Sequence, residues 1–372
     1  MRVIELAGLG PAPFACMFLA DLGAEVIRID RPAAGDLEVS PTFELLNRGK
    51  RSVIVDLKRS EGVDAVLSLA AHADIFVEGF RPGVAERLGL GPEAVLAGNP
   101  RLVYGRMTGW GQDGPLAPTA GHDISYIAVT GALHAMGERG GRPQIPLNLV
   151  GDFGGGATYL VIGLLAAMHE ARLSGRGQVV DASILDGTLH LLTMFHGMLA
   201  AGQWVDDRGA NTLDGGAPYY AVYETADGRF MAVGALEPKF YRELLRVLDL
   251  DDDPRCRQEH AHWPHLRTRI AEKFASRTQA EWIERFTGSD ACVSPVLSLQ
   301  DAASHPQVEA RRALVAVDGV TQSAVAPRFS EHPALSPGRP TEPGADTRAV
   351  LAEAGLDAER LIADGVAAER RR

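Results

Sequence analysis

Length, composition and charge set the first limits on this chain. It has 372 residues, which at roughly 150 residues per domain predicts more than one domain. Hydrophobic residues make up 46% and charged residues 23%, the usual balance of a folded globular protein, so extensive disorder is excluded. The net charge of −11 argues against a nucleic-acid-binding protein, which needs a basic face.

Cysteine usage and the N-terminal segment predict a cytoplasmic protein. Cys16, Cys256 and Cys292 are widely spaced and odd in number, so neither a disulfide framework nor a CxxC metal pair is expected. The N-terminus lacks a sustained apolar stretch followed by a cleavage site, so no signal peptide is expected. The longest apolar run, residues 159–168, is too short to span a bilayer, and we expect no membrane span.

The first half of the chain alternates short runs of β-branched and aromatic residues with helical stretches. This order is typical of the α/β class, and we expect a doubly wound, mainly parallel sheet covered by helices on both faces. Strands are predicted at residues 3–6, 25–30, 52–57, 74–77 and 101–107, and helices at 14–22 and 61–71.

The second half begins with longer helical patterns and then changes. Two long helices are predicted at residues 155–173 and 182–201. Farther on, Asp227-Gly228 between two apolar runs predicts a β-hairpin over residues 219–233. Further helices are predicted near residues 240–248, 265–274, 279–286 and 347–355.

These changes in pattern predict a large domain interrupted by a smaller α+β domain. A Gly- and Asp-rich segment and a Pro-rich segment mark the expected linkers. We therefore expect a large domain at 1–205, a linker at 206–217, a small domain at 218–315, a return linker at 316–343, and a C-terminal part of the large domain at 344–372.

Two familiar motifs are approached but not completed. Gly8-Leu9-Gly10 follows a strand and opens a helix, and Asp30 ends the next strand, as in a dinucleotide-binding fold. The third glycine of GxGxxG would fall at Pro13, so a βα turn rich in Gly and Pro is favoured over a nicotinamide site.

The second incomplete motif is a group of possible metal ligands. It comprises Cys256, His260, His262 and His265, but prolines interrupt it and its spacing matches no zinc pattern. A polar loop between helices is the favoured interpretation, and no metal or other cofactor is expected.

Two further motifs join chemically useful residues to glycines. His122 lies in Gly121-His122-Asp123, and Asp152 lies in a glycine-rich segment that opens a long apolar helix. A carboxylate at a helix N-terminus meets the positive end of the helix dipole, and glycines allow a ligand to approach the backbone. Taken singly, Asp152 is equally well explained as a helix N-cap and His122 as a hydrogen-bonded loop residue.

Blocks covering nearly the whole chain resemble, in the same order, the family III CoA-transferase (CaiB/BaiF) superfamily. Within it the resemblance is closest to the bacterial α-methylacyl-CoA racemases. The match is weakest at residues 32–47 and 250–270. The blocks are MRVIELAGLGPAP, DLGAEVIRIDRP, DIFVEGFRPGVAERLGLGP, GRMTGWGQDGP, GHDISYIAVTGALHAMG, PLNLVGDFGGG, GQVVDASILDG, DGGAPYYAVYETADGRFMAVGALEPKFY, APRFS and GADTRAVLAEAGL.

The resemblance implies an isomerase that interconverts (2R)- and (2S)-2-methylacyl-CoA thioesters. The family's catalytic histidine, aspartate and glutamate fall at His122, Asp152 and Glu237. Inversion at C2 requires proton removal on one face, proton delivery on the other and stabilisation of the enolate oxygen. We expect His122, with Glu237, on one face and Asp152 on the other, and Asp152 in a partly desolvated position that raises its pKa.

The resemblance also implies where the rest of the substrate lies. The enolate oxygen is expected against backbone amides at Gly151, Phe153 and Gly154. CoA is part of the substrate, so no separate cofactor is implied. The residues that the family uses to bind CoA fall at Arg31, Lys58, Arg81 and Arg87.

The family further implies an interlocked homodimer, with Glu237 supplied to each active site by the partner chain. The racemases move the acyl tail over a methionine-rich surface, and Met194 and Met198 lie four residues apart on a predicted helix. Core packing of these two methionines is the simpler interpretation.

Two other functions remain open at this point. In the CoA-transferases of the superfamily the aspartate is the nucleophile, so Asp152 alone does not distinguish a racemase from an enzyme that moves CoA between carboxylic acids. His122 and Glu237 favour the racemase. The third alternative, a catalytically inactive acyl-CoA-binding relative, is disfavoured because all three groups are present.

Overall fold

The chain forms two compact units in a computed structural model that describes residues 1–32, 40–251, 255, 257, 259–331 and 335–369. Unit 1 comprises Met1–Thr130, Leu147–Leu191 and Pro306–Arg372, and unit 2 comprises Gly131–Pro146 and Leu192–His305. Relative to the expected domains, residues 131–146 and 192–205 group with unit 2 and residues 306–315 with unit 1.

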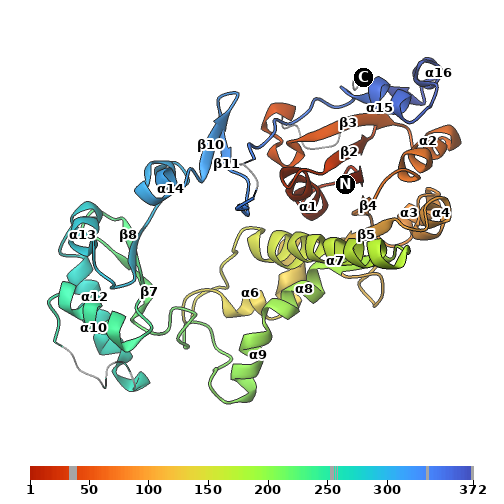
Figure 1. The fold of residues 1–372 in the computed structure, drawn as a ribbon. Helices are drawn as coiled ribbons and strands as arrows, with labels where there is room; N and C mark the ends of the chain where they lie inside the picture. The colour runs from red at the N-terminus through yellow and green to blue at the C-terminus, as the bar shows by residue number, and fades with distance from the viewer. Residues whose placement is uncertain (33–39, 252–254, 256, 258, 332–334, 370–372) are drawn as a thin grey trace. The chain divides into compact units, whose positions relative to one another are not determined.

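Unit 1 is built on a seven-stranded sheet (Figure 1). Its strand order is β12-β3-β2-β1-β4-β5-β6, and every neighbouring pair from β3 to β6 is parallel, whereas β12 is antiparallel to β3. The predicted α/β fold with a mainly parallel sheet is therefore confirmed. The strands are β1 (Arg2–Leu6), β2 (Glu25–Asp30), β3 (Lys50–Val55), β4 (Ile75–Glu78), β5 (Val103–Thr108), β6 (Val179–Ser183) and β12 (Ala367–Ala368).

Helices cover both faces of this sheet because its strands are apolar on both sides. Val3 and Val103 lie in a core with α1 and α7, whereas Ile4 and Tyr104 lie in a second core with α2, α4, α15 and α16. The sheet is thus doubly wound. The covering helices are α1 (Pro11–Asp21), α2 (Ser60–Ala70), α4 (Pro92–Gly98), α7 (Thr158–Ser174), α15 (Thr347–Glu353) and α16 (Ala358–Ala363).

The predicted helix at 182–201 is wrong in part. Residues 179–183 form the strand β6, which pairs with β5, and the helical residues after it divide into α8 (Ile184–Leu191) and α9 (Thr193–Ala200). The strand lies at the edge of the sheet, with Val179 exposed and Ser183 buried. Pairing with a strand more than 70 residues earlier, rather than local propensity, therefore determines its conformation.

The helix that carries Asp152 starts earlier than predicted. A π-helical segment, η3 (Leu149–Ala157), precedes α7 without a break. Its glycines allow close packing on α8, because a Cβ at Gly155 would lie only 2.6 Å from the Thr188 hydroxyl oxygen. Tertiary packing thus overrides the low helix propensity of glycine.

The continuous helix is longer than the apolar run that the sequence showed. Among the described residues, Leu149–Ser174 is long and apolar enough to cross a membrane, and 39% of its most apolar stretch is buried. This is weak evidence for a span, because core helices of soluble proteins share these properties. Leu160 and Leu164 of α7 are completely buried against the sheet.

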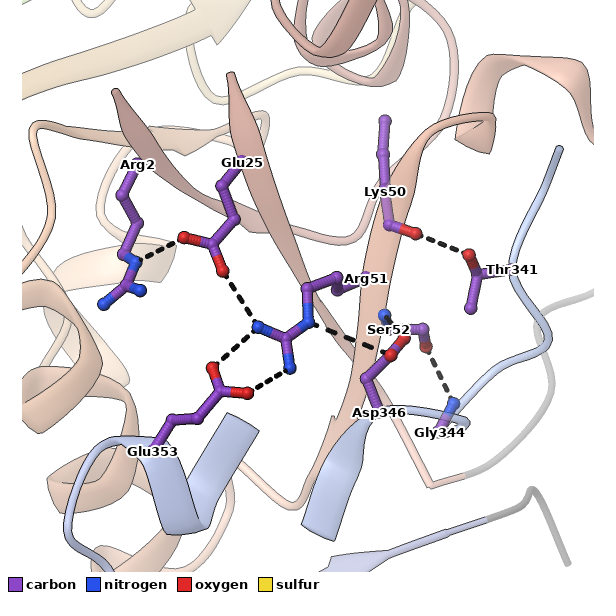
Figure 2. Close-up of polar contacts among 9 residues, drawn as sticks. All are labelled: Arg2, Glu25, Lys50, Arg51, Ser52, Thr341, Gly344, Asp346 and Glu353. Atoms are coloured by element: carbon purple, nitrogen blue, oxygen red, sulfur yellow. Dashed lines mark hydrogen bonds and ion pairs between the residues drawn. The ribbon is translucent and has the colours of Figure 1, made fainter. Parts of the chain in front are cut away.

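The C-terminal segment of unit 1 is fastened to β3 by polar contacts (Figure 2). Arg51 donates two hydrogen bonds to Glu353 at 2.7 and 2.8 Å and a third to Glu25 at 2.9 Å. One residue farther along β3, the Ser52 backbone N–H donates to the Asp346 carboxylate at 2.9 Å. These contacts join residues near both ends of the chain in one unit.

Unit 2 contains the predicted hairpin and three helices packed on it. β7 (Tyr220–Glu224), β8 (Phe230–Gly234) and β9 (Val293–Val296) form an antiparallel sheet. Its core includes Tyr223, Trp282 and residues of α10 (Pro238–Val247), α12 (Trp263–Phe274) and α13 (Gln279–Phe286), which confirms the helices predicted there.

Shorter elements complete the two units. They are η1 (Pro41–Phe43), η2 (Leu45–Asn47), α3 (Val84–Arg87), α5 (Asp123–Val129), α14 (Pro306–Ala310), β10 (Leu314–Val317) and β11 (Val320–Ser323) in unit 1, and α6 (Ala132–Ala135), η4 (His260–His262) and η5 (Asp301–Ser304) in unit 2.

Candidate active site

Loops gather at the carboxyl edge of the parallel sheet in unit 1. The sheet order places β1 beside β4, and the chain winds outward in opposite directions from this pair. Ligands of doubly wound proteins bind outside the carboxyl ends of the strands at such a reversal point. The loops that begin with Ala7 after β1, Gly79 after β4 and Gly109 after β5 are therefore expected to form the site.

Asp152 lies beside the loop that follows β1. A Cβ placed on Gly10 would lie 3.1 Å from Oδ2 of Asp152, so this carboxylate lies directly against the Gly10 backbone. Asn148 donates a hydrogen bond from Nδ2 to the same oxygen at 3.2 Å. Since η3 is capped at Asn148, Asp152 is within its first turn and is not the N-cap that one interpretation of the sequence suggested.

The surroundings of Asp152 favour its protonated form. Partial burial raises the pKa of its carboxyl group above the ordinary value, and the charge of Asp123 raises it further. The hydrogen bond from Asn148 and the nearby His122 lower this pKa, but burial has the largest effect. The structure thus agrees with the sequence-based expectation of a raised pKa.

His122 lies in the same region of unit 1. It is the N-cap residue of α5, and its side chain is exposed. The next residue, Asp123, is only 7% exposed and accepts a hydrogen bond from the backbone N–H of Asp152 at 2.7 Å. His122 and Asp152, which are 30 residues apart in sequence, are therefore joined through a single side chain.

Tyr126 is a site residue that the sequence interpretation missed. Its ring fills space left by two glycines, because a Cβ on Gly109 or Gly121 would lie 2.0 or 2.6 Å from a ring carbon. The ring also packs edge-on against Trp110 at 4.7 Å between centroids. Burial raises the pKa of the Tyr126 phenol, and the Asp152 carboxylate raises it further.

Helical spacing is the signal that could have identified two of the missed residues. Tyr126 follows His122 by four residues, and Asn148 precedes Asp152 by four. Side chains four residues apart lie on one face of a helix. Extending each motif by four residues, about one helical turn, would have included Tyr126 and Asn148.

The backbone amides proposed for the enolate oxygen are partly occupied. The N–H of Phe153 donates to the Asn148 carbonyl at 3.3 Å, and the N–H of Asp152 donates to Asp123. Gly151 is buried, and Gly154 is half-buried. The Phe153 ring stacks on Phe14 at 4.4 Å between centroids, which holds η3 against α1.

The four basic residues expected to bind CoA are exposed and follow the same edge of the sheet. Arg31 directly follows β2, Lys58 and Arg81 follow β3 and β4, and Arg87 ends α3. Among the described residues, none of these four side chains is in an ion pair within the chain. By contrast, Arg106 pairs with Glu78 and is not available to a ligand.

Glu237 lies in the other unit, at the N-cap of α10. The structure therefore brings together His122 and Asp152 but does not place Glu237 with them. Its charge is close enough to raise the pKa of the Cys292 thiol, an effect second to that of burial.

The two methionines of α9 are not part of a core. Met194 is 53% exposed, Met198 is half-buried, and no residue of α9 is buried. The core interpretation of these residues is therefore wrong.

The residues of the incomplete dinucleotide-binding motif and of the incomplete metal motif have structural surroundings that do not suit those ligands. Asp30 is 2% exposed and accepts hydrogen bonds from Arg28 and Ser52, so it is not presented to a ribose. His260 stacks on Trp263 at 3.9 Å. Cys256 lies outside the described residues, and the described part of the chain contains no group of three or more His, Cys, Asp or Glu side chains able to hold a metal.

Comparison with known proteins adds to this geometry. The family model described as CoA-transferase family III matches residues 1–347. Alpha-methylacyl-CoA racemase of Mus musculus is 45% identical over 366 residues, and that of Homo sapiens is 41% identical over 365 residues; each alignment covers 97% of this chain and 94% of the relative. The crystal structure of a CaiB/BaiF family protein from Brucella suis superposes with a TM-score of 0.81 at 26% identity, covering 95% of this chain and 98% of that one.

Proposed function

The chain belongs to the family III CoA-transferases, and on this premise we propose that it is a racemase that interconverts (2R)- and (2S)-2-methylacyl-CoA thioesters. The observation that carries the proposal is that His122 lies within electrostatic range of a half-buried Asp152 of raised pKa, in loops at the carboxyl edge of the sheet. Racemases with this substrate in their names are 41 and 45% identical to the chain over nearly its full length.

The proposed chemistry is a proton transfer through an enolate. Neutral His122 removes the proton at C2 from one face, the electron pair moves to the thioester oxygen, and protonated Asp152 delivers a proton to the other face. The opposite substrate enantiomer reverses the two roles. A carboxyl group can donate in this way only if its pKa is high enough to keep it protonated part of the time, and burial acts in that direction.

Backbone amides beside these groups stabilise the enolate oxygen in this proposal. The amides of Asp152 and Phe153 already have acceptors and Gly154 lies inside η3, so Gly151 is the remaining donor of the predicted set. The first two residues of α5, Asp123 and Ile124, offer further N–H groups, since the next two N–H groups already donate to the His122 carbonyl.

Arg31, Lys58, Arg81 and Arg87 bind the phosphates of CoA in the same proposal. Their exposed positions support it, because Arg31, Lys58 and Arg81 follow strands of the sheet, Arg87 ends the next helix, and all four present positive charge to solvent. CoA is part of the substrate, and we propose that no separate cofactor takes part.

We further propose an interlocked homodimer in which Glu237 of one chain orients His122 of the other. The exposed apolar side chains of α9 support a partner surface, since an apolar helix with no buried residue is poorly suited to water. We also propose a cytoplasmic location.

Transfer of CoA between carboxylic acids through Asp152 is the second candidate function. It is favoured by the family's name and by the accessible, half-buried position of Asp152, which suits a nucleophile as well as an acid. The two functions differ in one requirement, because only the transferase needs a second acid.

The test is to incubate a single enantiomer of a 2-methylacyl-CoA with the protein, without any acid, and to follow the other enantiomer by chiral chromatography. We expect its formation by the wild-type protein and its loss in His122→Ala and Asp152→Asn. Absence of epimerisation, together with CoA transfer when a carboxylic acid is added, would replace the racemase with the transferase.

A further inference from the structure

We propose that Asp123 is a positioning residue that fixes the separation of His122 and Asp152 during proton transfer. The inference rests on the proposed function, in which these two groups act on opposite faces of one carbon atom. Proton transfer between donor and acceptor requires hydrogen-bond distances, so a small change in this separation slows the reaction.

The first argument is connectivity. Asp123 is joined to His122 by a peptide bond, and its Oδ1 accepts the backbone N–H of Asp152 at 2.7 Å. That N–H precedes the first hydrogen-bonded turn of η3, which begins with Phe153 donating to Asn148. Asp123 therefore supplies an acceptor that the helix itself does not provide.

The second argument is the space kept for this contact. A Cβ on Gly151 would lie 2.3 Å from Oδ1 of Asp123 and 2.9 Å from Cγ2 of Ile127. Any residue other than glycine would have to displace the Asp123 side chain or shift η3. The sequence thus provides both the acceptor and the room for it.

The third argument is charge. Oδ2 of Asp123 is buried and has no hydrogen-bond partner among the described residues, so the carboxylate is poorly neutralised. The pKa of the Asp152 carboxyl depends on its burial and on three neighbouring side chains, those of Asn148, Asp123 and His122. Tyr126 also lies within electrostatic range of this carboxyl. Asp123 is the negatively charged member, and it favours the protonated form of Asp152 that proton delivery needs.

Two substitutions of Asp123 separate its geometry from its charge. Asp123→Asn keeps the size and one acceptor oxygen but removes the charge, whereas Asp123→Ala removes both. We expect Asp123→Asn to leave KM nearly unchanged and to lower the pKa of Asp152. Each unit of that decrease reduces the protonated fraction of Asp152 at neutral pH by up to about tenfold, and with it kcat for the enantiomer whose proton His122 removes, because the other enantiomer requires ionised Asp152. Asp123→Ala is expected to lose more activity than Asp123→Asn.

Gly151→Ala tests the contact without changing Asp123 or any charge. We expect a loss of kcat as the new Cβ displaces the carboxylate. The matched control is Gly98→Ala, because a Cβ at this position of α4 would meet nothing within 4 Å, and we expect wild-type kinetics. Wild-type kcat and an unchanged pH profile in both Asp123→Asn and Gly151→Ala would overturn the proposal.

A readout independent of activity distinguishes this inference from the proposed function. The Asp152 carboxyl is titrated by ¹³C NMR in protein labelled at the aspartate side chains, with Asp152→Asn for assignment. If the wild-type protein does not racemise but Asp123→Asn lowers the pKa of Asp152, the proposed racemase function would be refuted, whereas the effect of Asp123 on Asp152 would be confirmed. An active racemase in which this pKa does not change would refute the inference alone.

Discussion

The carboxylate of Asp152 lies against the backbone of Gly10 in a space that a side chain would fill. Gly10 has a φ of 71° and a ψ of −118°, a conformation that residues with a Cβ rarely adopt. The incomplete dinucleotide-binding motif around it was interpreted as a βα turn rich in Gly and Pro, and its neighbour in the structure is the proposed acid. The glycine therefore has two reasons to be there, one conformational and one catalytic.

Substitution of Gly10 by alanine should reduce activity more than its effect on stability explains. The new Cβ would lie 3.1 Å from Oδ2 of Asp152 and would displace the carboxylate. We expect at least a tenfold loss in kcat, equivalent to about 1.4 kcal/mol, and a lower free energy of unfolding. Steady-state kinetics and urea denaturation measure the two effects.

Gly175→Ala is the control for backbone strain. Gly175 also has a positive φ, of 74°, but a Cβ there would meet nothing within 4 Å. We expect a loss of about 1 kcal/mol in stability and unchanged kcat. Equal activity losses in the two variants would show that strain, rather than contact with Asp152, is responsible.

Glu78 should make stability depend on pH. Its side chain is 1% exposed, and burial raises its pKa from 4.5 to about 7, although Arg106 acts in the opposite direction. A carboxyl group whose pKa is raised by folding destabilises the protein once it ionises. The folded protein is therefore most stable, with respect to Glu78, below pH 4.5, where this carboxyl group is protonated in both states. This contribution to the free energy of unfolding is lost as the pH rises through about 7.

Comparison with Glu78→Gln isolates this effect, because the other titrating groups are common to both proteins. We expect the free energy of unfolding of the wild type, relative to the variant, to fall by up to about 3 kcal/mol between pH 4.5 and 8. Urea denaturation across this range measures the difference. A constant difference would mean that Arg106 fully compensates the buried charge.

At the scale of elements, the sequence predicted what depends on local pattern and missed what depends on distant contacts. The runs of β1 to β5 are apolar and bounded by turns, and their positions were correct within a few residues. The strand β6 and the start of η3 were missed, because β6 is completed by pairing with β5 and η3 by packing on α8. Neither partner is near in sequence.

The candidate site shows the same division. His122 and Asp152 were assigned from the family resemblance, because their motifs alone were equally well explained by structural roles, and their proximity in unit 1 follows from loops at one edge of a parallel sheet. The four-residue spacing from His122 could have indicated Tyr126, but the packing of its ring into the space left by Gly109 and Gly121 depends on the folded chain. The electrostatic effect of Asp123 likewise depends on its burial.

The contact between Arg51 of β3 and Glu353 of α15 is expected to stabilise α15 against local unfolding (Figure 2). Arg51 is the common partner of Glu25 and Glu353, and these side chains are partly exposed, so solvent weakens their attraction. We expect Arg51→Met to lower the stability of α15 by about 1 kcal/mol, which speeds its amide hydrogen exchange about fivefold.

The matched control is Arg246→Met on α10 of unit 2. Arg246 also makes two hydrogen bonds to a carboxylate, but Glu243 is its neighbour on the same helix. Exchange in α15 should not change in this variant. An equally slow exchange of α15 in Arg51→Met would show that the apolar core alone fastens the C-terminal segment.

At the scale of the whole molecule, the proposed dimer predicts that α9 is covered by a partner. Met194 and Leu199 are 53% and 47% exposed in the single chain. We expect Met194→Glu with Leu199→Glu to convert the dimer to an inactive monomer, as measured by light scattering and by epimerisation. A folded monomer with wild-type activity would contradict the shared site.

Mixing two inactive variants tests whether Glu237 comes from the partner. His122→Ala and Glu237→Gln each lack one group, and a mixed dimer would contain one complete site if the groups come from different chains. Co-expression should then restore about one quarter of the wild-type activity, because half of the dimers are mixed and each has one working site. No recovery would place all three groups in one chain.

Deuterium exchange at C2, measured by NMR in heavy water, tests the central claim most directly. Each enantiomer of a 2-methylacyl-CoA is incubated separately with His122→Ala and with Asp152→Asn, without any acid. If the two groups lie on opposite faces, each variant retains only the base that removes the proton from one enantiomer. We predict that the two variants exchange opposite enantiomers and that neither forms the epimer, whereas exchange of the same enantiomer by both variants would contradict the two-face mechanism.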